Sequence, residues 1–268
     1  MTEHARPLMN GLVGFVVGVA GGLIGLGGAE LRLPYLVGVV GLTAHRAVPV
    51  NLAVSLFTIV AAIPARLIAL SQIDLAPFLA ETVAIAIGAV VAAYLGVGWL
   101  RRLSGPTLGR IIFCLLLVLG VGMIAEAFIE VASDGILPTS PAARLLAALA
   151  FGVVIGAISS LLGVAGGEVI IPTLVFGYGV PIKAAGSLSL LISLPTVLTG
   201  IVRHARGGAF ADRAVVDRLI LPMGLGSALG AVIGGFLVSV APATAIKVTL
   251  GVLLIWSSAK VFAKHRRD

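Results

Sequence analysis

Long apolar runs recur along the whole chain, and they constrain its fold more than any other feature. The runs cover about 8–42, 47–65, 76–98, 110–130, 144–180, 185–202, 218–239 and 245–263. Each is long enough to cross the hydrocarbon core of a bilayer, which takes about 20 apolar residues as a helix. The runs do not alternate polar and apolar residues, as the strands of a transmembrane barrel would. The sequence therefore predicts an all-α, polytopic transmembrane helical protein.

Composition narrows the function classes. Only 11% of the 268 residues are charged, against roughly 25% in soluble domains, so the expected surrounding is a lipid bilayer. The net charge of +7 fits basic cytoplasmic loops, and no nucleic-acid partner is expected. The single cysteine, Cys114, lies inside an apolar run. Because no metal-ligand spacing and no nucleophile–base pairing is found, we expect no metal, no cofactor and no enzymatic activity.

The chain is an internal duplication. A shift of 138 residues places the stretch GFVVGVAGGLIGLGGAELRLPYLV, which begins at Gly14, on GVVIGAISSLLGVAGGEVIIPTLV, which begins at Gly152. The predicted units are a first transmembrane repeat over 6–130, a linker over 131–143 and a second repeat over 144–263. Duplication of a hydrophobic unit is typical of membrane transporters.

The first run of each repeat is too long for one helix and contains a glycine-rich break. If this run enters the membrane, breaks and returns, each repeat has a re-entrant segment plus three transmembrane helices, and the repeats are inverted. This topology gathers most arginines and both termini on the cytoplasmic side, as the positive-inside rule requires, and places Arg66 in a loop outside. The competing topology has eight crossings and parallel repeats, and it leaves more arginines outside.

The breaks are the predicted substrate site. The half-helix after each break begins near Ala29 or Gly167, so free backbone N–H groups and the positive end of the helix dipole face the break. Polar residues at helical spacing on the next helix of each repeat add hydrogen-bonding groups, which could equally join helix to helix. The predicted binding residues are Gly27, Gly28, Ala29, Asn51, Ser55, Ala165, Gly166, Gly167, Ser189 and Ser193.

Two acidic residues follow the breaks, Glu30 and Glu168. A carboxyl group inside a membrane is a candidate functional group, and burial could let it carry a proton coupled to transport. The alternative is a structural partner of Arg32 or of free N–H groups. Pro34 and Pro172 lie within the returning half-helices, where we expect each to kink its helix or to end it early.

The stretch GLIGLGGAELRLPYL, its echo SLLGVAGGEVIIPTL and the later KAAGSLSLLISLP resemble the TauE/SafE family of membrane proteins. The resemblance covers nearly the whole chain, although Ala29 and Ala165 stand where glycine is common. It implies transport of a small sulfur oxyanion or organosulfur anion: sulfite, thiosulfate or a sulfonate. We expect alternating access in a multi-pass protein of the bacterial inner membrane, with proton coupling through the two glutamates as one reading. The alternative is a passive anion channel of the same fold.

Overall fold

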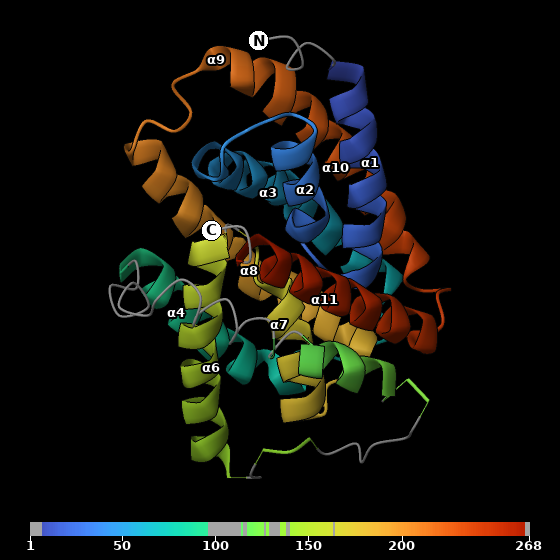
Figure 1. The fold of residues 1–268 in the computed structure, drawn as a ribbon. Coiled ribbons are helices and arrows are strands. Elements are labelled where there is room, and N and C mark those ends of the chain that lie inside the picture. Colours follow the sequence, from blue (N-terminus) through green and yellow to red (C-terminus); the bar gives the residue numbers. More distant parts are fainter. Residues whose placement is uncertain are drawn as a thin grey trace.

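The computed structural model of the protein describes residues 7–95, 114, 117–125, 127–128, 135–137, 140–162 and 164–265. In these ranges every regular element is helical (Figure 1). Six of the described helices are long and apolar enough to cross a membrane: Pro7–Ile24, Arg46–Ala69, Ala76–Leu95, Pro141–Ser159, Ile182–Arg206 and Arg213–Leu237. The predicted all-α, polytopic membrane fold is confirmed. The predicted linker and the helix expected at 110–130 lie partly outside the described residues.

The first repeat opens with a helical hairpin. Helix α1 (Pro7–Ile24) is followed by a short turn and by α2 (Ala29–Gly38). The Tyr35 hydroxyl, near the end of α2, donates a hydrogen bond to Asn10 Oδ1 at 2.8 Å, near the start of α1. The chain therefore turns back on itself, with the glycine-rich break at the tip of the hairpin.

The second repeat opens in the same way, with α6 (Pro141–Leu162), α7 (Gly167–Pro172) and the π-helix η3 (Thr173–Gly177). Just beyond η3, the Tyr178 hydroxyl donates to the carbonyl oxygen of Arg144 at 3.1 Å, near the start of α6. The α-helical winding ends at Pro172, a residue without an N–H to donate, and the wider winding of η3 continues the segment.

The remaining elements surround these hairpins. They are α3 (Ala44–Ala69), η1 (Ala76–Phe78), α4 (Leu79–Leu95), α8 (Ile182–Arg206), α9 (Arg213–Val215), η4 (Val216–Ile220), α10 (Leu221–Leu237) and α11 (Ala243–His265). Helix α1 runs beside α10, and α4 runs beside α6 (Figure 1). The first helix of each repeat thus packs on the third long helix of the other repeat, α10 or α4, so the two repeats interlock.

Glycines allow the two helices of each of these pairs to approach closely. A Cβ placed on Gly14 of α1 would lie 2.1 Å from the carbonyl oxygen of Met223 in α10, and one on Gly152 of α6 would lie 2.2 Å from that of Ile85 in α4. Small residues allow such backbone contact between membrane helices, where apolar burial gives no driving force for association. The outward faces of these helices carry exposed apolar side chains such as Leu229, as a lipid-facing surface requires.

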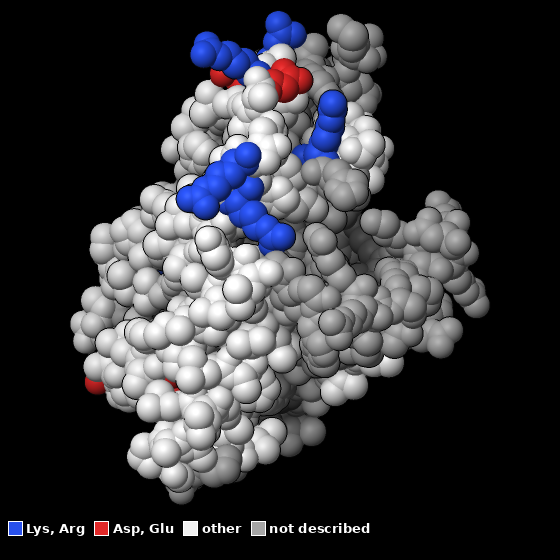
Figure 2. Space-filling model, turned by 90° about the vertical axis from the view of Figure 1, so that its left-hand side faces the viewer, with Lys and Arg blue, Asp and Glu red and all other residues white. Residues whose placement is uncertain are grey.

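Arginines gather at one end of the molecule, which we call the arginine end. Figure 2 shows basic side chains on the upper part of one face, above a broad surface almost without charge. Arg46 shares a cavity with the loop at 208–212, and Asn10 at the start of α1 donates to the carbonyl oxygen of Arg218. The arginine end comprises Arg46, Arg203, Arg206, Arg213 and Arg218.

The placement of Arg66 in an external loop is wrong. Arg66 belongs to α3 and is fully buried. Its Nη1 donates to the carbonyl oxygens of Gly22 and Leu23 at 2.8 and 2.7 Å, and its Nη2 donates to that of Lys183 at 2.8 Å. Carbonyl groups at the end of a helix lack intrahelical donors and attract cations. Arg66 therefore caps α1 at the point where the first break begins.

Candidate functional site at the paired helix breaks

The two glycine-rich breaks lie against each other. A Cβ placed on Gly27 would be 2.7 Å from the Cβ atom of Ala165, and one placed on Gly167 would be 2.8 Å from Cδ2 of Leu26. Segments 138 residues apart in the sequence thus meet at the centre of the fold. In this conformation the breaks touch directly, so a ligand can enter between them only when they separate.

Each break ends on a glycine in the left-handed conformation. Gly28 has φ 69° and precedes α2, and Gly166 has φ 81° and precedes α7. Residues with a side chain rarely adopt this backbone geometry, and a Cβ on Gly28 would also lie 2.8 Å from Val17 Cγ1. The half-helices start at Ala29 and Gly167, the residues that the sequence predicts. Their first N–H groups have no acceptor within the helix.

In the first repeat, the predicted polar residues of α3 hold the break. Asn51 Nδ2 donates to the carbonyl oxygen of Ala29 at 3.0 Å. The Ser55 hydroxyl donates to the carbonyl oxygen of Asn51 at 2.8 Å, and it also accepts from Arg32. Both side chains are fully buried, so the predicted residues do meet at the break.

Arg32 is the principal residue that the sequence interpretation undervalued. All five N–H donors of its buried guanidinium are engaged, and each goes to an uncharged acceptor. The acceptors are the carbonyl oxygens of Gly27 and Gly28 and the hydroxyls of Ser55, Thr58 and Ser227. Arg32 therefore fixes the break and joins it to α3 and α10. A lone arginine inside an apolar run was the available signal.

Hydroxyl groups hold the second break, where Ile170 takes the place of Arg32 in the repeat. Ser193 donates to the carbonyl oxygen of Ala165 at 2.9 Å, and Ser159 of α6 donates to that of Val164. The Ser189 hydroxyl is buried and makes no hydrogen bond within the described residues; a Cβ on Gly167 would lie 3.2 Å from it. An unused hydroxyl thus faces the start of α7.

The two glutamates have different surroundings. Both carboxylate oxygens of Glu30 are shielded from solvent and make no hydrogen bond within the described residues. Within the same part of the chain, Glu30 forms no ion pair with Arg32. Glu168 is buried at the start of α7. The described residues hold no group of three or more His, Cys, Asp or Glu side chains that could bind a metal ion.

This arrangement of apolar helices and paired breaks defines a polytopic helical membrane protein with a buried polar centre. The family described as sulfite exporter TauE/SafE matches residues 1–123 and 148–268. The chain therefore belongs to the TauE/SafE family, which places it among membrane transport proteins. No curated protein and no solved structure matches the chain.

Proposed function

We propose that the protein moves a small anion across the membrane through the paired breaks. The observation that carries this proposal is the contact of the two breaks, at Gly27–Ala165 and Leu26–Gly167, each at the N-terminus of a half-helix. Helix N-termini attract anions through their dipoles and free N–H groups. Discontinuous helices at corresponding places in two halves are typical of transporter binding sites.

Arg32 adds a full positive charge to this centre. Its guanidinium is held by neutral groups only, so its charge is not cancelled by a direct carboxylate contact. All five of its N–H donors are engaged by these neutral groups, so a bound oxyanion would take the place of one or more of them. A guanidinium recognises oxyanions through such donors. An oxyanion of sulfur is therefore the substrate class that we propose, in agreement with the family.

We further propose alternating access by two inverted repeats in the bacterial inner membrane, with both termini cytoplasmic. The first hairpin begins beside Arg218, at the arginine end, and the second begins where Arg144 pairs with Glu81 of α4 at 2.9 Å. Hairpins that begin at different ends and meet at their tips can open the site to one side at a time. The predicted substrate contacts are those of the ten residues named at the breaks.

Of the two glutamates, Glu30 is the proposed coupling residue. Its carboxyl group makes no hydrogen bond to another residue of the described structure, so a proton can be gained or lost without breaking a contact with a neighbour. It also lies at the N-terminus of α2, beside the proposed anion site. A proton on Glu30 would reduce negative charge where the anion binds, so the two would bind cooperatively.

Counterflow in proteoliposomes tests this function. Vesicles loaded with unlabelled sulfite should accumulate labelled sulfite transiently from outside, and the rate should saturate with concentration. A passive channel of the same fold would give unsaturated flux with no counterflow. A thermal-shift series with sulfite, thiosulfate, sulfonates, sulfate and carboxylates identifies the ligand, because a ligand that binds the folded state raises its stability. No stabilisation and no flux with any of these anions would refute the proposal.

A further inference from the structure

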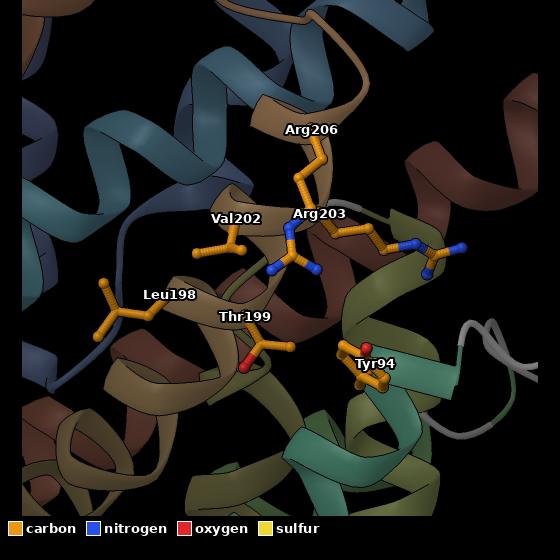
Figure 3. A pocket seen from close by; sticks show the side chains of 6 residues that line it. All are labelled: Tyr94, Leu198, Thr199, Val202, Arg203 and Arg206. Carbon is orange, nitrogen blue, oxygen red and sulfur yellow. The ribbon is translucent and has the colours of Figure 1, made fainter.

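An open cavity lies between the C-terminal parts of α8 and α4, away from the contact between the breaks. Its volume is about 580 Å³, and it is lined by Tyr94, Leu198, Thr199, Val202, Arg203 and Arg206. Figure 3 shows the arginine side chains of α8 over this space, with Tyr94 facing them from α4. Residues 199, 202, 203 and 206 have helical spacing, so they form one face of α8.

Two guanidinium groups at this cavity offer a site for an oxyanion. Nη1 of Arg203 donates to the carbonyl oxygen of Ala93 at 3.2 Å, near the end of α4. This contact holds the side chain across the gap between the helices, and the group has further donors. Arg206 is exposed at the end of α8. No carboxylate is among the described residues that line the cavity, so within this part of the chain neither cation has a carboxylate partner there.

A second, smaller cavity continues inward from Arg203. Its volume is about 30 Å³, and it is lined by Leu52, Ala93, Ser159, Thr196, Gly200, Arg203 and His204. Such a space holds about one water molecule, and a sulfur oxyanion, which has four or five heavy atoms, does not fit. Arg203 lines both cavities, so the larger and the smaller cavity adjoin at this residue.

The inner cavity reaches the second break through Ser159. The Ser159 hydroxyl donates to the carbonyl oxygen of Val164, and its Cβ atom would lie 3.6 Å from a Cβ placed on Gly166. Gly166 precedes the half-helix α7. A line of polar groups therefore leads from the arginine end of α8 to one of the paired breaks.

We propose that the cavity between α8 and α4 is an outer binding site for the transported oxyanion, and that Arg203 lies between this site and a narrow path to the second break. The proposal rests on the function proposed above. An oxyanion could also come from a phospholipid headgroup, because Leu198 and Val202 give the cavity an apolar side. The test below therefore compares both sources.

Charge-selective alkylation tests the outer site. In a Cys114→Ala background, Thr199→Cys places the only thiol in the cavity, and its rates with iodoacetate and iodoacetamide are measured. Both reagents alkylate the thiolate with loss of iodide, but iodoacetate is an anion and iodoacetamide is neutral. A change in the reactivity of the thiol itself therefore cancels in the ratio of the two rates. A unit charge about 6 Å away in water changes the local anion concentration about threefold. We expect the ratio of the iodoacetate rate to the iodoacetamide rate at Thr199→Cys to exceed that of the exposed control Ser71→Cys by about this factor for each arginine.

Variants and competing anions identify the occupant. Arg206→Gln should lower this ratio about threefold. In phosphatidylcholine vesicles, sulfate or methanesulfonate should slow the reaction of the Thr199→Cys thiol with iodoacetate. If these anions have no effect while phosphatidylglycerol slows the reaction, the site holds a lipid headgroup and the proposal is wrong. A ratio at Thr199→Cys equal to that at Ser71→Cys would also overturn it.

Transport measurements test the link between the cavity and the breaks. Arg203→Gln should reduce sulfite counterflow several-fold, whereas Arg213→Gln, at the same end but outside the cavity, should leave it unchanged. If wild-type protein moves anions and Arg203→Gln matches Arg213→Gln, the path through Arg203 is refuted and the transport function stands. If wild-type protein moves no anion, the proposed function fails, whatever the alkylation ratio shows.

Discussion

The contact between the two breaks can be tested by exchanging one methyl group across it. In Gly27→Ala, the new Cβ atom would lie 2.7 Å from that of Ala165, well inside van der Waals contact. Its next neighbours, Ser55 Cβ at 3.5 Å and Ile59 Cδ1 at 3.6 Å, are at ordinary distances. The clash is therefore with Ala165 alone, and Ala165→Gly should remove it.

The expected free energies follow from this geometry. Overpacking a well-packed core costs about 1–3 kcal/mol, so Gly27→Ala should lower the free energy of unfolding by that amount. Ala165→Gly loses one buried methyl, worth about 0.8 kcal/mol, and gains chain flexibility worth about 0.5–1 kcal/mol. If the two positions were independent, the double variant would lose the sum of these two free energies. Because the two residues touch, we expect the double variant to be no less stable than Ala165→Gly alone. Its stability would then exceed the additive expectation by about 1–3 kcal/mol, which is the coupling free energy.

Unfolding of purified protein in detergent and sulfite counterflow in proteoliposomes both report this coupling. Gly27→Ala should lower stability and transport, and adding Ala165→Gly should restore transport toward that of Ala165→Gly. Gly38→Ala is the matched control, because it adds a methyl where nothing lies within 4 Å. Strictly additive losses in the double variant would show that the breaks do not touch, and the proposed site would lose its main support.

Three further changes probe the charged residues. Arg32→Met should cost about 1–3 kcal/mol, because the buried Gly27 carbonyl oxygen loses its donor, and should abolish stabilisation by sulfite; Ile170→Met, at the matching position of the second repeat, should change both little. Arg66→Met should lower the thermal unfolding temperature without changing the apparent affinity for sulfite, because Arg66 caps α1 rather than facing the site; a large loss of affinity would contradict this. Transport by Glu30→Gln should lose its pH dependence, whereas Glu168→Gln should keep it; an unchanged pH profile in Glu30→Gln would exclude proton coupling through that residue.

Local chemistry explains why the breaks were predictable. Glycine in left-handed backbone geometry marks the end of one helix and the start of another, and the same pattern occurs twice at a fixed shift. The half-helices consequently begin at Ala29 and Gly167 as predicted. Pro34 remains inside α2, whereas the α-helical winding ends at Pro172. Prolines at corresponding positions of the two repeats therefore have different effects, because tertiary packing decides whether a helix continues past a proline.

Long-range contacts explain what the sequence did not predict. Hydropathy placed Arg66 in a loop because charge is costly in a membrane, but carbonyl groups of α1 and Lys183 satisfy the buried guanidinium. Ser227, an acceptor for Arg32, comes from a helix 195 residues later in the chain. No local pattern indicates such a partner. The cavity between α4 and α8 likewise depends on helix packing between the repeats.

The two breaks are alike in backbone and different in charge, and this difference bears on how a transporter of this kind would work. The first break is tied to α3 and α10 by the five hydrogen bonds of one buried cation, Arg32. The second is tied to α8 and α6 by single bonds from Ser193 and Ser159 to neighbouring carbonyl oxygens. In the proposed mechanism, the first repeat would supply the charge that attracts an anion, and the second would supply hydroxyl groups on the side of the site toward the cavity that Arg203 lines.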